Sequence, residues 1–259
     1  MSKVLAIAMV GIKELVRRKD FYVLFILTAL ITLLLGSINF FNEDHIARYL
    51  KEVCLLLIWV AMLVMAVVTA ARQLPSELEG KTIFPLLAKP VSRVEVLLGK
   101  FAGCWLACGL ALLVFYLFFA VLSASREQTL PLASYVQAFW LHWVMLAIVT
   151  AMTLWGSLLL SAPSSNATIV LIISIGILLV GQHLNKVAVQ LSGLTGVVTA
   201  AVYYAIPHLE FYDMRSVIIH NWGTQPWGII ALATLYGACY TAVLLLGGWL
   251  AFRRKVLNP

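Results

Sequence analysis

The chain has 259 residues, of which 63% are hydrophobic and 11% are charged, and its mean hydropathy is +0.99. An ordinary soluble domain is about 45–50% apolar and about 25% charged, and about 250 residues already approach the largest size of a single soluble core. The composition therefore excludes a soluble enzyme, a disordered chain and a secreted disulfide scaffold. It predicts one all-α polytopic membrane domain.

Residues 1–20 predict an amphipathic helix that lies in the cytoplasmic membrane interface. Its apolar stripe at helical spacing consists of Val4, Ala8, Gly11, Ile12 and Leu15. Most of its charged residues lie off that stripe, namely Lys3, Lys13, Glu14, Arg17 and Arg18. The apolar run is short and leads into basic residues instead of a cleavage site, which argues against a signal peptide.

Residues 21–259 contain six apolar runs that are long enough to span a membrane. A bilayer core of about 30 Å needs about 20 apolar residues in a helix, and none of the runs carries a charged residue in its interior. The six predicted spans are 21–41, 53–71, 99–123, 136–161, 168–184 and 227–252.

The distribution of charge predicts the orientation of these spans. The segments assigned to one side hold 13 basic and 5 acidic residues, and those on the other side hold 5 basic and 6 acidic residues. The basic segments are 1–20, 72–100, 162–167 and 253–259. Basic loops stay in the cytoplasm, so both termini are predicted to be cytoplasmic, in the cell (inner) membrane. The net charge of +7 thus reflects topology and does not indicate a nucleic-acid partner.

Residues 187–206 form a further apolar stretch between the fifth and sixth spans. If this stretch crossed the membrane, the basic residues 253–255 would lie outside, against the charge rule. It also contains Gly193 and Gly196 and is followed by Pro207. We therefore expect a re-entrant or interfacial helical hairpin on the outer side, with a seventh span as the alternative.

Two features within the spans have both a functional and a structural interpretation. Cys104 and Cys108 would share a helix face and could suggest a metal pair, but no other ligand lies nearby in the sequence, so packing is favoured. His142 is the one ionisable residue deep in a span, beside Trp140 and Trp143. An interfacial anchor is the favoured interpretation of His142, and a proton carrier is the alternative.

The polar segment 72–98 between the second and third spans is the most structured of the predicted loops. Residues 76–79 and 92–95 both have capping-box spacing, preceded by Pro75 and Pro90. The pattern predicts a short helix, a break, and a second helix that enters the third span. A simple connector needs only a few residues, so we interpret this segment as a docking surface, with a plain solvated loop as the alternative.

The same segment does not form a nucleotide-binding loop. The sequence Gly80-Lys81-Thr82 resembles the end of such a loop, but Pro75 stands where the phosphate cradle requires a glycine. Gly99-Lys100 fails as well, because Phe101 follows it. We expect that the chain does not bind ATP by itself.

These strings resemble the coupling-helix region of type-2 ABC transporter permeases. The resemblance rests on the order of three segments, 77–82, 86–93 (LLAKPVSR) and 97–101. It extends over the chain as an amphipathic N-terminal helix, six spans, and outer helices between the last two. Pro85 departs from the expected leucine-rich run, which indicates a broken helix between Glu77 and Ala88.

The resemblance implies the permease subunit of an exporter that moves substrate when a separate ATPase docks on the coupling loop. The docking residues that it implies are Glu77, Glu79, Lys81, Thr82 and Arg93. It further implies a second permease copy and two ATPase subunits. ATP and Mg would bind to the ATPase, with no cofactor on this chain and no enzyme activity of its own.

The loop before the last span carries a candidate outer-side ligand set. Its residues are His208, Glu210, Asp213 and His220. With Met214 they could bind a transition metal, and their spacing resembles the copper-processing, nitrous-oxide-reductase-maturation branch of these permeases. The favoured interpretation is a hydrogen-bonded linker in which Asp213 and Arg215 settle the helix ends, with no metal.

Other function classes fit the sequence less well. An ion-coupled secondary transporter normally keeps acidic or basic residues in its spans, and these interiors have none. An intramembrane enzyme would need a base beside hydroxyls such as Ser157, Ser164 or Ser165. A non-transporting membrane anchor for an ATPase stays open. The Leu-, Val-, Ile-, Trp- and Phe-rich spans suit a lipid-like substrate and equally suit plain lipid contact.

Overall fold

The computed structural model describes residues 3–17, 19–37, 43–79, 91–127, 131–160, 162–190 and 194–255. Within these ranges the regular structure is helical, without strands, which confirms the predicted all-α fold. The elements are α1 (Lys3–Arg17), α2 (Lys19–Ser37), α3 (Glu43–Glu79), α5 (Arg93–Glu127), α6 (Leu132–Leu159), α7 (Pro163–Gln190), α8 (Leu194–Ala205), η1 (Leu209–Tyr212), α9 (Arg215–Ile219) and α10 (Trp227–Arg254).

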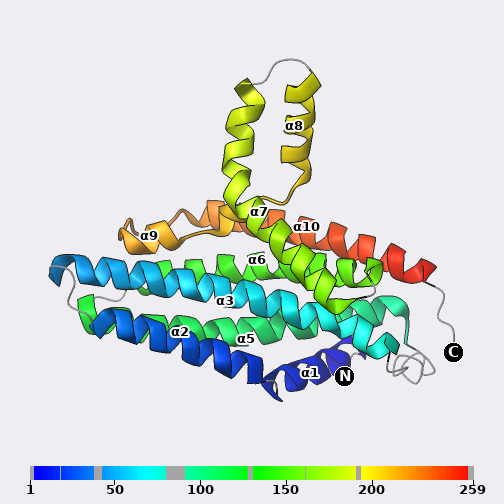
Figure 1. Cartoon of the computed structure of the whole chain (residues 1–259), viewed down its shortest axis with the longest axis horizontal. Coiled ribbons are helices and arrows are strands. Elements are labelled where there is room, and N and C mark those ends of the chain that lie inside the picture. The colour runs from blue at the N-terminus through cyan, green and yellow to red at the C-terminus, as the bar shows by residue number, and fades with distance from the viewer. Residues whose placement is uncertain are drawn as a thin grey trace.

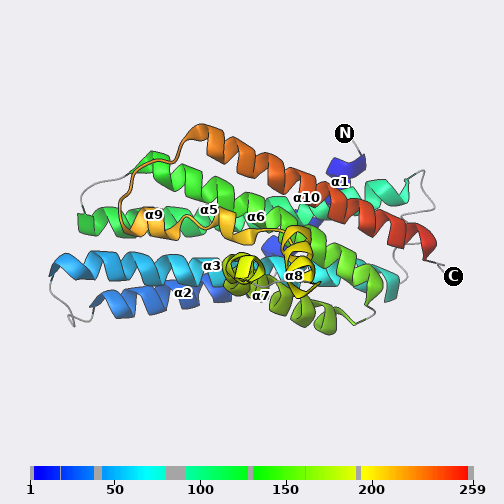
Figure 2. The same ribbon diagram turned by 90° about the horizontal axis from the view of Figure 1, so that it is seen from above.

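Five long helices, α2, α3, α5, α6 and α10, lie side by side along the long axis of the molecule (Figures 1 and 2). Helix α6 packs against α3, α5, α7 and α10, and α3 also packs against α2 and α7. The main core lies between these helices and includes Met62, Phe115 and Met145, which are all fully buried. Helix α1 and the end of α10 lie toward the same end of this bundle (Figure 1).

Four of the predicted spans are confirmed as helices that are long and apolar enough to cross a membrane. These helices are Arg48–Glu77, Arg93–Ser125, Leu132–Leu159 and Trp227–Arg254. The other two predicted spans, 21–41 and 168–184, overlap the shorter apolar segments Phe21–Leu34 and Pro163–Leu179. The count of six spans therefore stays a prediction.

The first capping box does not form, and the short helix predicted to start there is instead the end of α3; the break predicted between the two helices lies outside the described residues. Pro75 lies inside α3, which continues to Glu79. The hydroxyl of Ser76 donates to the carbonyl oxygen of Arg72 at 2.6 Å, so it does not cap a new helix. Leu74 is fully buried and Pro75 is buried as well. Packing of this turn against the bundle keeps the backbone helical despite the hydrogen bond that proline lacks.

The second capping box forms as predicted. The backbone N–H of Ser92 donates to Oε2 of Glu95 at 2.7 Å, and the backbone N–H of Glu95 donates to Oγ of Ser92 at 3.2 Å. These reciprocal bonds satisfy donors that the first turn of a helix leaves open. They set the start of α5 at Arg93.

Helix α1 confirms the predicted N-terminal helix and is fixed to α5 through small residues. Ala8 and Gly11 on its apolar stripe are buried. They face Gly103 of α5, and a Cβ at Gly103 would lie 2.9 Å from the carbonyl oxygen of Ala8; Gly99, one turn earlier on α5, lies against Ile7 and Val4. Small residues four apart allow two helix backbones to approach closely within a membrane. The α1–α5 contact therefore depends on the absence of a side chain at Gly103.

The C-terminal part of α7 and the whole of α8 form a hairpin that stands out from the bundle across its long axis, whereas the first part of α7 packs on the bundle (Figures 1 and 2). The segment 187–206, expected to be a helical hairpin, provides the last turn of α7 and all of α8. Because it lies across the other helices, it is not placed as a seventh parallel span. Its relation to the membrane stays a prediction. Val197 and Tyr204 on α8 are 66% and 75% exposed, so this hairpin offers an apolar surface to lipid or protein.

Candidate functional site

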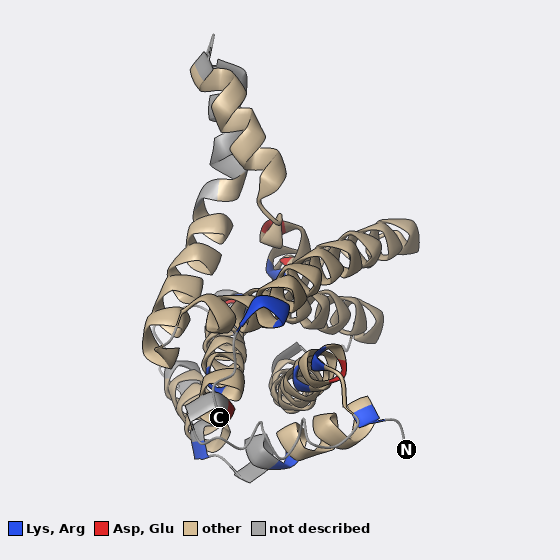
Figure 3. Ribbon diagram, turned by 90° about the vertical axis from the view of Figure 1, so that its right-hand side faces the viewer, with Lys and Arg blue, Asp and Glu red and all other residues tan. Residues whose placement is uncertain are grey.

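The candidate site is the end of the bundle where α3 finishes, α5 begins and α10 finishes, which is the predicted cytoplasmic end. Figure 3 views the molecule from this end, with the basic and acidic residues coloured. Of the predicted docking residues, Lys81 and Thr82 lie outside the described residues. Glu79 is the last residue of α3, and its side chain is also outside them. The structure places the side chains of Glu77 and Arg93.

Glu77 forms an ion pair with Lys100, which joins α3 to α5. The Lys100 side chain is only 5% exposed, and its Nζ also donates to Oε1 of Gln73 at 3.1 Å. Within the described part of the chain, Oε2 of Glu77 is buried without a hydrogen-bond partner. A buried charge is costly unless a partner compensates it. Lys100 and Glu77 therefore depend on each other.

Arg93 caps the end of α10. Its Nη1 donates to the carbonyl oxygens of residues 252, 253 and 255, and its guanidinium lies 5.4 Å from the ring centroid of Phe252. The last turn of a helix leaves carbonyl groups unpaired and carries partial negative charge. A guanidinium at this position donates hydrogen bonds to the unpaired carbonyl groups and compensates the partial negative charge. Lys255 Nζ donates in turn to the carbonyl oxygen of Leu158 at 3.4 Å, which adds α6 to this connected set.

The predicted docking segment is therefore bounded by residues that are fixed to the rest of the bundle. The sequence indicated Glu77 and Arg93 but not their partners, Lys100, Gln73 and the carbonyl groups of α10. No local pattern could have found these partners, because residues 93 and 252 are brought together only by the packing of α5 on α10. The docking role of Glu77 and Arg93 stays a prediction.

The outer loop matches the favoured interpretation of a hydrogen-bonded linker. Arg215 donates to the two carboxylate oxygens of Asp213 at 2.9 and 2.7 Å, and the backbone N–H of Arg215 donates to Asp213 at 3.0 Å. The hydrogen bond to Asp213 raises the pKa of the Arg215 guanidinium above its ordinary value. Asp213 thus accepts a hydrogen bond from the first backbone N–H of α9 and stabilises the start of this helix, as expected.

The candidate ligand residues do not converge on one point. Nδ1 of His208 lies 3.2 Å from Oε1 of Glu210, whereas Asp213 is occupied by Arg215 and His220 stacks on Trp222. Among the described residues, no group of three or more His, Cys, Asp or Glu side chains is arranged to hold a metal ion. The copper-processing branch therefore gains no support from the geometry.

The interfacial-anchor interpretation of His142 is wrong. His142 is fully buried in the core, with its ring stacked on Trp59 at 5.1 Å between centroids and edge-on to Tyr116 at 6.1 Å. Neither ring nitrogen has a hydrogen-bond partner in the described structure. The sequence did not show which face of α6 is inward, and the tryptophan neighbours favoured a position at the membrane interface. Trp140 is on the more exposed face.

The two cysteines of α5 follow the packing interpretation. Cys108 lies in the main core, and Cys104 lies in a second apolar cluster near the predicted cytoplasmic end. Both side chains are buried.

Comparison with known proteins gives one match that covers nearly the whole chain. The family described as ABC-2 family transporter protein matches residues 5–257. No curated protein sequence matches the chain.

Proposed function

Because this chain belongs to the ABC-2 transporter family and is a multi-pass membrane permease subunit, we propose that it is driven by a separate ATPase that docks on residues 72–98. The proposed direction of transport is export. The proposed assembly holds two permease copies and two ATPase subunits in the inner membrane, with both permease termini in the cytoplasm. ATP and Mg bind to the ATPase in this proposal, and the chain itself binds no cofactor.

One observation carries this proposal. The two helices that bound the docking segment are joined to each other by Glu77 and Lys100, and α5 is joined to α10 by Arg93. A force applied between residues 79 and 93 would therefore act on α3, α5 and α10 together. A loop that was only a connector would need no such fixed ends.

The test is a charge reversal at the end of α3. Glu79→Lys should leave the permease folded and inserted, because a charge in the last turn of a helix typically changes stability by only about 0.3–1 kcal/mol. At a docked interface, loss of one partner of a buried charge pair costs about 2–5 kcal/mol. We expect the variant to lose co-purification with its ATPase, or to lose transport-linked ATP hydrolysis. Normal co-purification together with normal coupled hydrolysis would contradict the docking assignment.

Arg93→Glu tests the other end of the segment, but this change also removes the cap of α10. Arg93→Gln is the matched control, because it removes the same cap without reversing the charge. A docking role predicts that the glutamate variant loses the ATPase and that the glutamine variant keeps most of it. Equal loss in the two variants would assign Arg93 to the fold alone.

The specific observation that favours ion-coupled transport is the buried imidazole of His142, which lacks a hydrogen-bond partner within the described residues. In vesicles without any ATPase, this alternative predicts substrate movement driven by a proton gradient and abolished by His142→Asn. The proposed function predicts no movement under these conditions. A non-transporting anchor predicts no movement even with the ATPase and ATP present.

A further inference from the structure

We propose that a crevice between α1, α2, α3 and α5 binds an acyl chain of an anionic phospholipid from the inner leaflet, with the headgroup beside Lys13 and Lys19. We call it the elbow crevice, because it lies where α1 turns into α2. This site is separate from the docking segment, and its place in the inner leaflet rests on the proposed orientation with both termini in the cytoplasm.

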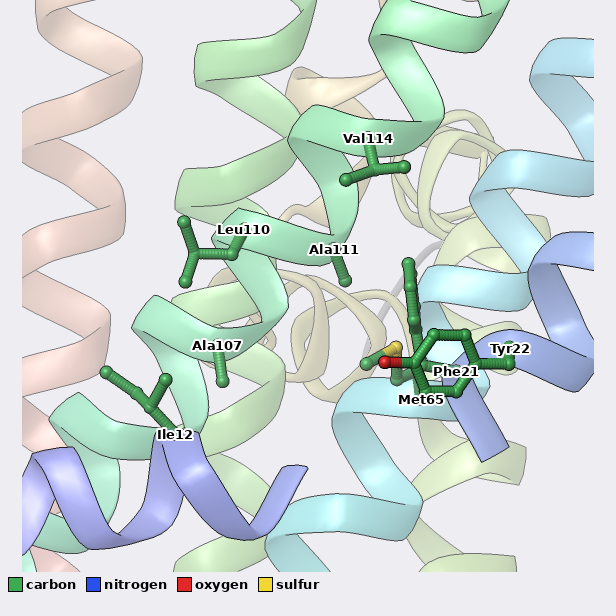
Figure 4. Close-up of a pocket in the computed structure, with 8 residues that line it drawn as sticks. All are labelled: Ile12, Phe21, Tyr22, Met65, Ala107, Leu110, Ala111 and Val114. Atoms are coloured by element: carbon green, nitrogen blue, oxygen red, sulfur yellow. The ribbon is translucent and has the colours of Figure 1, made fainter. Parts of the chain in front are cut away.

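The walls of the elbow crevice are apolar. Figure 4 shows four residues of α5 on one side, namely Ala107, Leu110, Ala111 and Val114. On the other side are Phe21 and Tyr22 at the start of α2 and Met65 of α3. The cavity volume is about 220 Å³. An apolar cavity of about 150 Å³ stays dry and takes up benzene, so this crevice has room for a segment of hydrocarbon chain.

The elbow crevice is open to the side of the bundle. Leu110, Val114 and Tyr22 on its rim are 54%, 41% and 49% exposed. Its inner wall is closed, because Ala107 and Ala111 are 4% and 6% exposed and belong to the main core. A chain of the surrounding lipid can therefore enter from the membrane without any opening of the bundle.

The charges at the elbow select the headgroup. Lys13 directly follows Ile12, which lines the crevice, and Lys19 precedes Phe21 by two residues; both lysines are exposed. In the sequence, residues 13–20 hold four basic and two acidic residues. Basic pockets between helices on the cytoplasmic side attract anionic headgroups, with about 1 kcal/mol for each basic residue near the surface. An anionic phospholipid suits both the apolar walls and the basic residues that neighbour Ile12 and Phe21 in the sequence.

The fixed position of α1 keeps this mouth in place. The close contact of Ala8 with Gly103 holds α1 against α5, so that Ile12 stays at one end of the crevice. A helix that merely floated in the interface would not hold its lysines at a constant distance from the crevice. The bound lipid would in turn contact α1, α2, α3 and α5 together.

The test measures lipid retention in the full chain, purified from bilayers of phosphatidylcholine with a minor fraction of phosphatidylglycerol. Native mass spectrometry should show phosphatidylglycerol retained in preference to phosphatidylcholine. Leu110→Trp, which places a large ring at the mouth, should abolish this retention. The matched control is Leu113→Trp, because Leu113 is a 43% exposed leucine of the same helix that does not line the crevice. This control should retain lipid as the wild type does.

The charge and filling variants complete the test. Lys13→Gln with Lys19→Gln should lower the preference for phosphatidylglycerol on the order of tenfold. Ala107→Leu, which fills the inner wall, provides a second filling variant should Leu110→Trp fail to fold. Unchanged retention in the filling variants, or an unchanged preference in the lysine variant, would overturn the proposal. So would a disulfide between two Leu110→Cys chains in the bilayer, which would show a second copy over the crevice.

Discussion

Lys100 is a buried cation at the predicted cytoplasmic end, and its stability there depends on its partners. Its side chain is 5% exposed. It forms an ion pair with Glu77 and donates a hydrogen bond to Gln73 across the contact of α3 with α5. Replacement of a complete buried ion pair by apolar or neutral groups is often nearly neutral, whereas loss of one partner leaves an uncompensated charge. The single variants and the double variant therefore differ in a predictable order.

We expect Lys100→Met to lower the free energy of unfolding by about 3 kcal/mol, because Glu77 then lacks its partner. Glu77→Gln should destabilise the protein by a similar amount for the converse reason. The double variant should be more stable than either single variant. Thermal unfolding in detergent gives this order, and additive losses in the double variant would contradict a coupled pair.

Gly103 provides a second test at the residue scale. A Cβ there would meet the backbone of Ala8 at 2.9 Å, so Gly103→Ala should separate α1 from α5 and cost about 1–3 kcal/mol. The control is Gly176→Ala in α7, where a Cβ has no heavy atom within 4 Å and alanine favours the helix by about 0.5–1 kcal/mol. Thermal unfolding of the two variants compares them directly. Equal stability of the two would show that the close contact is not needed.

At the scale of elements, the sequence predicted structure correctly where the interacting residues lie within one helical turn of each other. The box at Ser92 and Glu95 needs only residues three apart, and it forms. The box at Ser76 has the same spacing and fails, because the buried turn around Leu74 continues α3 through Pro75. The position of His142 was predicted wrongly for a related reason. Helix α6 carries apolar residues on all of its faces, so its sequence does not show which face points into the core.

Helix α10 shows how an element depends on a distant residue. Arg93 donates to two carbonyl groups of its last turn and to that of the capping residue Lys255. We expect Arg93→Gln to speed amide hydrogen exchange in residues 249–255 and to cost up to about 2 kcal/mol, because a partly buried cation is lost from a helix C-terminus. Arg254→Gln removes an equal charge from an exposed position in the same turn. Equal exchange in the two variants would mean that Arg93 does not cap α10.

At the scale of the whole molecule, composition and the length of the apolar runs were enough to predict a helical membrane bundle, and four helices long and apolar enough to cross a membrane lie at the predicted places. The path of the α7–α8 hairpin was not predictable. Its sequence is apolar on all sides, so lipid, a bundle neighbour or a second copy would each satisfy it. The exposed apolar residues of α8 leave one face of this hairpin uncovered by the described part of the chain.

The orientation of the bundle is the last prediction, and it rests on the charge difference between the two sets of loops. Ser76 near the end of α3 and Thr224 before α10 are both exposed, and they lie on opposite predicted sides. With all four native cysteines replaced, we expect a membrane-impermeant thiol reagent to label Thr224→Cys in intact cells and to label Ser76→Cys only after the membrane is opened. Labelling of both sites in opened membranes serves as the control for reactivity. The reverse pattern would place the basic loops outside and would remove the cytoplasmic setting that both ATPase docking and an inner-leaflet lipid at the elbow crevice require.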